Sequence, residues 1–442
     1  MIKLPEQVNK AICLLKNSGF EAYAVGGAVR DCLLGKVPFD WDITTSARPE
    51  ETEKVFCGER IIETGIKHGT VTVIIDDMPL EITTYRIDGD YTDHRHPQTV
   101  SFSDNLRDDL SRRDFTINTL CCNCDDKIID AFGGKDDLNN KIIRCVGDPD
   151  TRFSEDALRI MRAVRFSAEL GFKIEKSTSD SILKNRQLLS DVSKERLQVE
   201  FTKLITGKYA TDVIRKYHAV IEVFIPELAP LVECEQHTKY HKYDVFEHTL
   251  HAVDAIDFND RILRLTMFFH DFGKPDAKTT DENGTSHFKG HAVISEKKTR
   301  DILKRLKFDN NTINEVSKLV LIHDMKSPRD KIQAKKMMCS LGDEAYLNLI
   351  KIKRADNMAK ADPHAIDEKL KNMRSFYEEI KINNECYNLK SLAVNGDDIK
   401  AFGIAEGKEI KSSLDFLLKG VIEGKCQNRK DELLEYLKEN TK

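Results

Sequence analysis

The sequence predicts an α+β protein in which residues 1–140 form a mixed α/β unit and almost all of the rest is helical. Two observations predict the first part. The stretch "EAYAVGG" indicates a short strand that enters a glycine turn, and the alternating stretches "TVTVII" and "LEITTY", separated by "DDMP", predict a hairpin. A third observation predicts the second part, because helical periodicity prevails after "SEDALRIMRAVRF".

The elements follow in order along the chain. Residues 1–18 are expected to be helical, and "AVRDCLLG" predicts a helix that Gly35 closes. A second strand then carries Asp40 and Asp42. Since 442 residues exceed the size of one ordinary core, we expect several domains. Changes in motif and periodicity place their boundaries so that the regions are 1–140, 141–235, 236–365 and 366–442.

Composition restricts the class of protein. Hydrophobic residues make up 40% of the chain and charged residues 32%, as in soluble globular proteins, and no apolar run is long enough to span a membrane. The net charge of −5 gives no general attraction to nucleic acid, although the segment 184–216 has a surplus of Lys and Arg. Eleven scattered cysteines and the lack of a secretory signal pattern predict reduced thiols in the cytoplasm.

Two aspartates close to a glycine pair are the first candidate for chemistry. Side chains alternate along a strand, so Asp40 and Asp42 point the same way and can hold divalent cations, as in two-metal phosphoryl transfer. Gly26 and Gly27 would let backbone amides approach phosphates, and Arg30 would add a positive charge. Taken singly, an Asp-x-Asp on a strand edge can simply be solvated and a Gly-Gly can be an ordinary turn.

Several ordered motifs resemble the class II tRNA nucleotidyltransferase family, which contains CCA-adding enzymes and bacterial poly(A) polymerases. The motifs are "GGAVRDCLLG" with "DWD", "RRDFTIN", "EDALRIMRAVRF" and "KERLQVEFTKLI". The resemblance implies a polymerase-β-like head with a mixed sheet, followed by all-helical neck, body and tail regions. It implies that Asp40 and Asp42 bind Mg²⁺ and that Gly27 and Arg30 contact the nucleotide.

The motif "RRDFTIN" and the predicted hairpin add further candidates. The resemblance implies that Arg113, Asp114 and Asn118 lie near the sugar and triphosphate. Without the family, the preferred interpretation is that Arg112 and Arg113 are a surface pair bound to Asp108 and Asp109. Glu81, on the predicted hairpin, is either a third carboxylate of the site or an exposed glutamate.

A helix predicted to begin near Ser154 carries a group of charged residues. At 100° per residue, Glu155, Arg159 and Arg162 fall within an arc of about 60°. Ser154 can cap this helix, and its arginines are expected on the face opposite the core. An arginine and a carboxylate held together can bind the edge of a cytosine or adenine. The resemblance implies that Asp156 and Arg159 contact the incoming base, with Arg162 and Arg165 nearby on base or phosphates.

Two other segments carry weaker expectations. The polar stretch "RIDGDYTDHRHPQTVSF" predicts a mobile loop, and it resembles the flexible loop of full CCA-adding enzymes. It therefore favours complete CCA synthesis and leaves addition of A alone open. The cysteines of "CCNC", Cys121, Cys122 and Cys124, lack metal-site spacing and are predicted to be buried apolar residues.

A second ordered set in the carboxy-terminal half resembles the HD phosphohydrolase superfamily. Its stretches are "VFEHTLHAV", "LRLTMFFHDFGKP", "FKGHAVIS", "LVLIHDM" and "IKRADNMAK". His248, His270, Asp271 and Asp356 could surround a divalent ion that activates water. His291 and His323 could bind a second ion or phosphate, although an isolated histidine on a helix is more often a core residue.

Together these features predict an enzyme that adds CCA to tRNA from CTP and ATP with Mg²⁺, and that carries an HD domain with an unidentified divalent metal. One alternative is a bacterial poly(A) polymerase or A-adding enzyme. The other is an HD phosphohydrolase whose head only binds RNA. Beyond Pro363 the helical, lysine-rich region is expected to be a tail that helps to hold tRNA.

Overall fold

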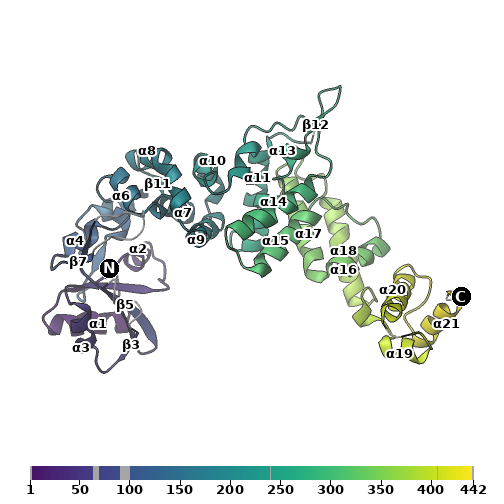
Figure 1. The fold of residues 1–442 in the computed structure, drawn as a ribbon, viewed down its shortest axis with the longest axis horizontal. Coiled ribbons are helices and arrows are strands. Elements are labelled where there is room, and N and C mark those ends of the chain that lie inside the picture. Colours follow the sequence, from purple (N-terminus) through teal and green to yellow (C-terminus); the bar gives the residue numbers. More distant parts are fainter. Residues whose placement is uncertain (1, 63–68, 90–99, 239, 406, 441–442) are drawn as a thin grey trace. The chain divides into compact units, whose positions relative to one another are not determined.

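The computed structural model describes residues 2–62, 69–89, 100–238, 240–405 and 407–440 (Figure 1). The chain forms two compact units. The amino-terminal unit comprises Met1–Ala229 with Arg305–Lys307, and the carboxy-terminal unit comprises Pro230–Lys304 with Phe308–Lys442. The finer division into four regions stays a prediction. None of the described helices is long and apolar enough to cross a bilayer.

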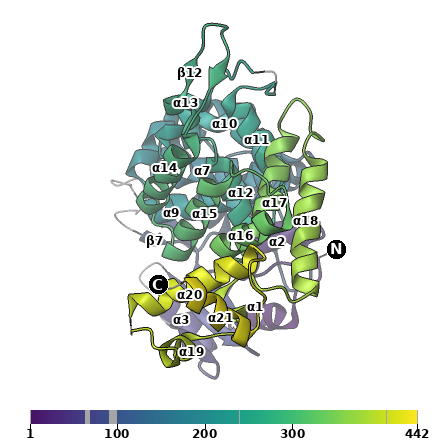
Figure 2. The ribbon, with the colours of Figure 1, turned by 90° about the vertical axis from the view of Figure 1, so that its right-hand side faces the viewer.

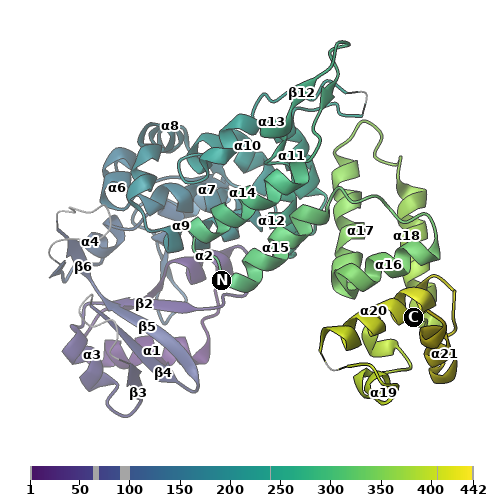
Figure 3. The same ribbon diagram turned by 45° about the vertical axis from the view of Figure 1, so that its right-hand side comes forward.

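A seven-stranded mixed sheet forms the centre of the head. Its spatial order is β3-β4-β5-β2-β1-β8-β9, and only the β2–β5 pair is parallel. Figure 3 shows β2, β5 and β4 side by side. The strands are β1 (Ala22–Val25), β2 (Trp41–Thr45), β3 (Arg60–Ile62), β4 (Thr70–Ile75), β5 (Met78–Thr84), β8 (Cys121–Cys122) and β9 (Ile128–Ile129).

The predicted hairpin is confirmed as β4 and β5. Its two-residue turn consists of Asp76 and Asp77, whose φ angles of 47° and 62° match the twist of the flanking strands. β6 (Arg86–Asp88) and β7 (Val100–Phe102) pair as a small ribbon. The centre of the predicted mobile loop, residues 90–99, lies outside the described residues.

Helices accompany the sheet. The predicted first helix is α1, which spans Glu6–Asn17 and contacts β1 with a buried face that includes Ile12 and Leu15. The helix predicted after the glycine turn is α2 (Gly27–Leu33). The others are α3 (Pro49–Val55), α4 (Leu106–Ser111), the short 3₁₀ helix η2 (Thr116–Asn118) and α5 (Gly134–Asn139).

The rest of the amino-terminal unit is helical apart from one ribbon, in which β10 (Ile142–Ile143) pairs parallel with β11 (Lys173–Ile174). α7 packs against α9 and α10 and has a largely buried surface. The helices are α6 (Pro149–Glu155), α7 (Leu158–Leu170), α8 (Lys176–Asn185), η3 (Arg186–Asp191), α9 (Lys194–Ile205), α10 (Ala210–Ile221) and η4 (Pro226–Leu231).

The prediction of one helix starting near Ser154 is wrong. Ser154 lies inside α6, which Asp148 caps by accepting a hydrogen bond from the Thr151 amide. α6 ends at Glu155 because Asp156 is extended (φ −135°, ψ 102°), and α7 begins at Leu158. The Asp156 carboxylate accepts a hydrogen bond from the Leu158 amide, so it stabilises the start of α7.

The carboxy-terminal unit is helical, as predicted, with one small hairpin of β12 (Thr279–Thr280) and β13 (Ser286–His287). α11, α12, α15 and α17 pack together, and α19, α20 and α21 lie together near the carboxyl end (Figure 2). The helices are α11 (Val245–Asp254), α12 (Arg261–Phe269), α13 (Lys274–Ala277), α14 (His291–Arg305), α15 (Asn310–Ile322), α16 (Lys331–Leu341), α17 (Asp343–Met358), α18 (Asp367–Ile382), η5 (Leu389–Ser391), α19 (Gly396–Ala401), α20 (Lys408–Ile422) and α21 (Lys430–Asn440).

Candidate functional site

Three carboxylates gather on the head sheet. Asp42 is in β2, Asp40 lies two residues earlier just before the strand, and Glu81 pairs with Asp42 across the parallel β2–β5 ladder. The protein surrounding Asp42 raises its pKa to about 6, against the opposing effect of Arg113, and repulsion from Glu81 and Asp40 adds to the rise. Glu81 therefore belongs to the same group of carboxylates, and this concentration of negative charge is suited to a cation.

The turn between β1 and α2 approaches this group closely. Gly26 has φ 83°, a conformation that favours glycine. A Cβ atom at Gly26 would lie 3.3 Å from Arg113 Nη1 and 3.7 Å from Asp42 Oδ2. The backbone conformation favours glycine here, and a Cβ atom would press on the Arg113 guanidinium; Gly27 follows as the first residue of α2.

A chain of hydrogen bonds connects "GGAVRD" with "RRDFTIN". Arg30 is buried and donates to Asn118 Oδ1 at 2.8 Å, and its guanidinium also pairs with Asp31 at 2.8 Å. Asn118 donates to Asp114 at 2.9 Å, and Asp114 pairs with Arg162 of α7 at 2.7 Å. The structure thus joins four predicted residues in one network: Arg30, Asn118, Asp114 and Arg162.

The arginine pair of "RRDFTIN" partly follows the alternative interpretation. Asp109 is fully buried and pairs with Arg112 at 2.5 Å and with Arg113 at 3.4 Å. Burial opposes the charged form of Asp109, but the two guanidinium groups outweigh it and lower the pKa of that carboxyl. Asp108 instead accepts a hydrogen bond from Ser103. Arg113 also acts on the candidate site, because its charge lowers the pKa of Asp42 and its Nη1 approaches the Gly26 turn.

The predicted base-reading residues lie around the break between α6 and α7. Glu155 pairs with Arg159 at 2.6 Å and with Arg152 at 2.7 Å. Asp156 pairs with Arg196 of α9 at 2.8 Å. Asp156 and Arg159, the two residues predicted to contact the base, are therefore three residues apart in the chain. They pair with different residues, Arg196 and Glu155.

The expectation that the arginines of α7 face away from the core is wrong. Arg159 and Arg165 are 8% and 7% exposed, and Arg165 pairs with Glu200 of α9 at 2.9 Å. Arg162 is partly buried and pairs with Asp114. The reason is that α7 packs between neighbours that supply carboxylates, so charged side chains can be buried in pairs.

Arg196 and Glu200 pair with predicted site residues but were not predicted themselves, although both lie in the stretch "KERLQVEFTKLI". Glu200 is buried on α9 in the same stripe as Leu197 and Leu204. A carboxylate within an apolar stripe is unusual, and an arginine-rich helix lies nearby in the sequence. Together these two features could have marked Glu200 as the partner of a buried arginine. Nothing comparable marks Arg196, because its partner lies 40 residues away.

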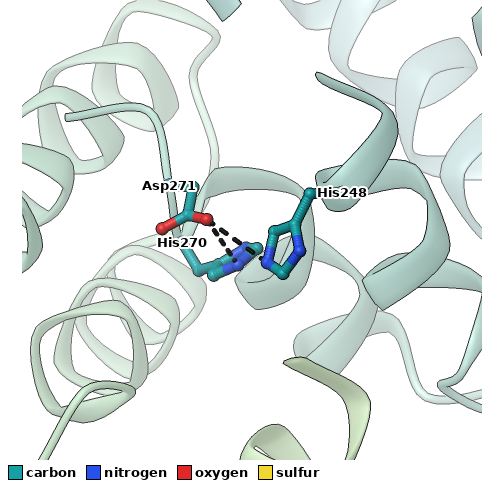
Figure 4. Close-up of side chains that lie close together, drawn as sticks. All are labelled: His248, His270 and Asp271. Atoms are coloured by element: carbon teal, nitrogen blue, oxygen red, sulfur yellow. Dashed lines mark ion pairs between the residues drawn. The ribbon is translucent and has the colours of Figure 1, made fainter. Parts of the chain in front are cut away.

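The carboxy-terminal unit contains a separate group of buried ligands. His248 of α11 and His270, which follows α12, both face Asp271 (Figure 4). The Nε2 atom of His248 lies 3.5 Å from Asp271 Oδ2, and the Nε2 atom of His270 lies 3.1 Å from it. His248 Nε2 also lies 3.0 Å from Asp356 Oδ1 of α17. The four residues predicted to share one ion are thus brought together.

A second group shares Asp271. His291 Nε2 and His323 Nε2 lie 3.4 and 3.8 Å from Asp271 Oδ1, and 3.1 Å from each other. The Nδ1 atoms of His248, His270, His291 and His323 all face backbone carbonyl oxygens, at 2.6–3.3 Å. This arrangement fixes each ring so that Nε2 is presented to the carboxylate, as in metal sites whose histidines are held by second hydrogen bonds.

Polar atoms without hydrogen bonds mark the centre of these groups. Within the described part of the chain, His270 Nε2 and Asp271 Oδ1 are buried without a well-formed hydrogen bond, whereas Asp271 Oδ2 lies 2.7 Å from Lys274 Nζ. Burial disfavours the charged carboxylate of Asp271, but His270 and Lys274 outweigh it and hold its pKa well below the usual range. Burial also lowers the pKa of His323 to about 3, so its imidazole is neutral. Ionised carboxylates and neutral imidazoles are good ligands for divalent transition metals.

Two of the three cysteines of "CCNC" follow the prediction. Cys121 and Cys122 are buried in β8, where burial raises the pKa of the Cys121 thiol to about 12, whereas Cys124 lies beyond the end of the strand and is only half-buried. All eleven cysteines are free thiols. Within the described residues, the groups of three candidate metal ligands lie at the histidines and Asp271, not at "CCNC".

Three family models match successive parts of the chain. "Poly A polymerase head domain" matches residues 22–144, and "Probable RNA and SrmB-binding site of polymerase A" matches residues 171–231. "tRNA nucleotidyltransferase domain 2 putative" matches residues 279–437. These matches cover parts of both structural units.

Known relatives agree over nearly the full length. The CCA-adding enzyme of Bacillus velezensis is 34% identical over 96% of this chain and 95% of its own, and that of Bacillus subtilis is 33% identical over 96% of each. The structure of the Bacillus stearothermophilus CCA-adding enzyme in complex with CTP superimposes with a TM-score of 0.68 at 30% identity, covering 98% of this chain and 96% of that one. The Thermotoga maritima enzyme complexed with tRNA shares the fold, with a TM-score of 0.63 at 21% identity, covering 98% of this chain and 94% of that one. With this identity over almost its whole length, the chain belongs to the CCA-adding enzymes, a family of tRNA nucleotidyltransferases.

Proposed function

We propose that this enzyme completes the CCA sequence at tRNA 3′ ends from CTP and ATP, and that the head carries the nucleotidyl transfer site. The observation that carries the assignment is the group of Asp40, Asp42 and Glu81 beside the Gly26 turn and Arg113. At this place, carboxylates that can hold a cation lie beside a backbone turn that can approach a phosphate and a guanidinium that can bind phosphate oxygens.

Asp40 and Asp42 would hold Mg²⁺, with Glu81 as a neighbour that raises the negative charge. The bound ion would neutralise the triphosphate and support attack on its α-phosphorus. In that reaction the tRNA 3′ oxygen bonds to the α-phosphorus, the bond to the β-phosphate bridge breaks, and pyrophosphate leaves. Arg113 is placed to bind phosphate oxygens. The Arg30–Asn118–Asp114 network fixes the wall of the site, and we assign Gly27, Arg30 and Asn118 to nucleotide contact.

We assign base selection to the start of α7. Asp156 can accept a hydrogen bond from the exocyclic amino group that cytosine and adenine share, and Arg159 can donate to ring acceptors. The ion pairs Glu155–Arg159 and Asp156–Arg196 hold both groups in defined orientations. Arg162 and Arg165, through Asp114 and Glu200, support this arrangement and lie close to it.

The test uses tRNA that lacks CCA, given CTP, ATP or both, with products sized at single-nucleotide resolution. We expect two additions with CTP alone, and three with both nucleotides, after which extension stops. A long tract made from ATP alone would instead identify a poly(A) polymerase. Asp40→Ala and Asp42→Ala should abolish addition while tRNA still binds. Asp77→Asn, at the exposed hairpin turn, should keep full activity and is the control.

The buried ligand groups of the carboxy-terminal unit favour a second activity, metal-dependent hydrolysis of phosphate esters. His248, His270, Asp271 and Asp356 would hold one divalent ion, and Asp271, His291 and His323 a second. The atoms of His270 and Asp271 that lack hydrogen bonds support this assignment. Such ions supply an activated water and stabilise charge on the phosphate.

Hydrolysis is tested with the full chain and Mg²⁺, Mn²⁺, Ni²⁺ or Co²⁺ on phosphate esters such as 2′,3′-cyclic nucleotides. Asp271→Ala should remove hydrolysis and leave CCA addition intact. If the unaltered enzyme hydrolyses no phosphate ester, including compounds that carry a second phosphate, this unit serves tRNA binding only.

The remaining assignments follow from these. We propose a nucleotidyltransferase head at 1–140, a neck and body at 141–235, an HD domain at 236–365 and a tail at 366–442. The free thiols support a reducing cytoplasm as the place where tRNA is processed.

A further inference from the structure

A cavity of about 450 Å³ opens beside the buried histidines of the carboxy-terminal unit. Two of its lining residues, His323 and Asp356, belong to the candidate metal groups, so the cavity continues from them. Its other walls come from the segment after α15, from α17 and from the start of α18. This volume is typical of sites for small molecules.

The cavity is strongly basic. Five cations and two carboxylates line it, and the cations are Lys326, Arg329, Lys353, Lys360 and Lys369. The carboxylates are Asp324 and Asp356, and Asp356 already contacts His248 at 3.0 Å and Lys360 at 2.6 Å. The charge of the cavity is therefore positive even before any metal ion is bound.

Among the described residues, four of these cations form no direct ion pair. In the part of the chain that the structure describes, Lys326, Arg329, Lys353 and Lys369 form no ion pair with a carboxylate, whereas Lys360 pairs with Asp356. Lys353 is half-buried. Burial lowers the pKa of its ammonium, the nearby carboxylates of Asp356 and Asp324 oppose this change, and the ammonium groups of Lys360 and Lys369 add to it.

Gathering like charges in a partly enclosed space costs free energy unless an anion compensates them. Here Lys353 of α17 and Lys369 of α18 lie with Lys326 and Arg329 around one cavity that ends at candidate metal ligands. The arrangement suits a phosphorylated ligand that reaches from those ligands into the cavity.

We propose that the substrate of this unit is a small molecule with at least two phosphate groups, one of which reacts at the histidine–aspartate groups while the other is bound by Lys326, Arg329, Lys353 and Lys369. The assignment rests on the hydrolase activity proposed above. Nucleoside polyphosphates and nucleotides that carry two separate phosphates belong to this chemical class.

The reaction is a hydrolysis. The oxygen of one water bonds to the reacting phosphorus, and the bond from that phosphorus to the leaving oxygen breaks. One proton of the water goes to the new phosphate and the other to the leaving group, so no further reactant is needed. The basic cavity holds the leaving group through its remaining phosphate and stabilises the negative charge that develops on it.

Binding to the full chain loaded with Mn²⁺ tests the proposal, with inorganic tripolyphosphate and orthophosphate as calorimetric probes. We expect tripolyphosphate to bind at least about tenfold more tightly, because it can occupy both places. The double variant Lys353→Met/Lys369→Met should weaken tripolyphosphate binding about tenfold or more and leave Mn²⁺ affinity and CCA addition unchanged. Lys371→Met, exposed on α18 and outside the cavity lining, is the matched control.

Different failures have different meanings. Equal affinity for the two probes, or tripolyphosphate binding that the double variant does not change, would overturn the proposal while Mn²⁺ binding stands. A loss of tRNA affinity in the double variant with unchanged tripolyphosphate affinity would also overturn it and assign the lysines to RNA. If the enzyme binds no Mn²⁺, and His270→Ala changes nothing, the metal site is wrong. In that case, tripolyphosphate binding measured with a chelator present shows whether the cavity binds phosphate groups without a metal ion.

Discussion

Asp42 holds a charge that the folded head disfavours. Asp42 is an exposed residue of β2, but nearby protein and the carboxylates of Glu81 and Asp40 raise its pKa to about 6, so between pH 4 and 6 the folded state binds more protons than the unfolded state. Stability therefore falls as the pH rises through this window and stays lower above it. We predict that Asp42→Asn unfolds at a higher temperature than the unaltered enzyme at pH 8, and is about 1 kcal/mol more stable after allowance for solvent screening.

The measurement is thermal unfolding across pH 4–8 with a chelator present. The advantage of Asp42→Asn should vanish near pH 4, where the carboxyl is protonated in both states. Asp77→Asn, at the exposed turn of the same sheet, should show no such trend. An Asp42→Asn protein that is no more stable at pH 8 would show that neighbouring cations already neutralise the carboxylate.

Arg165 is predicted to act mainly in stability. It is buried with Glu200, so Arg165→Met leaves this carboxylate with only the longer, 3.9 Å contact to Arg162 and should cost about 3 kcal/mol in the free energy of unfolding. The double variant Arg165→Met/Glu200→Leu removes both charges and should recover most of that loss. Denaturant unfolding of the two variants checks this prediction. Equal stability of the single and double variants would assign Arg165 to substrate contact instead.

At the scale of elements, α9 holds the start of α7. Arg196 pairs with Asp156 at the break after α6, so we predict that Arg196→Met weakens base selection without contacting the base itself. The ratio of kcat/KM for CTP to that for UTP should fall about tenfold, since a charged hydrogen bond that orients Asp156 is lost. Single-nucleotide addition kinetics with each nucleotide measure this ratio.

Two further variants separate positioning from general damage to α9. Arg196→Lys retains a donor and should restore part of the selectivity. Lys203→Met, exposed on the same helix, should leave the ratio unchanged. If Arg196→Met lowers addition of both nucleotides equally, α9 supports activity but not base choice.

The elements that sequence predicted well are those fixed by local signals. The β4–β5 hairpin follows from alternation and a two-residue turn, and the Gly26 turn follows from glycine beside a short strand. The same locality explains why Asp40, Asp42 and Arg113 could be proposed from motifs. The helix break at Asp156 and the role of Glu200 were not predicted, because both depend on α9, which packs on α7 from about 35–40 residues away.

For the whole molecule, the ligands of each candidate metal site lie inside one structural unit. Asp40 and Asp42 belong to the amino-terminal unit, and the histidines with Asp271 and Asp356 belong to the carboxy-terminal unit. Neither set needs a residue from the other unit. The two activities should therefore respond to different substitutions and different ions.

Binding of a transition metal should stabilise one unit selectively. Because the histidine–aspartate groups connect α11, α12, α14, α15 and α17, an ion bound there restrains all of these helices. A free ion at about 100 times its Kd adds about 2.7 kcal/mol to the stability of the folded unit, which slows exchange through global opening about 100-fold. We predict that Mn²⁺ slows hydrogen exchange in these helices and not in β1, β2 or β5. Asp271→Asn should abolish this protection and still add CCA with Mg²⁺, whereas Asp42→Asn should keep the protection and lose addition. Equal slowing in both units, or protection that survives Asp271→Asn, would place the ion elsewhere.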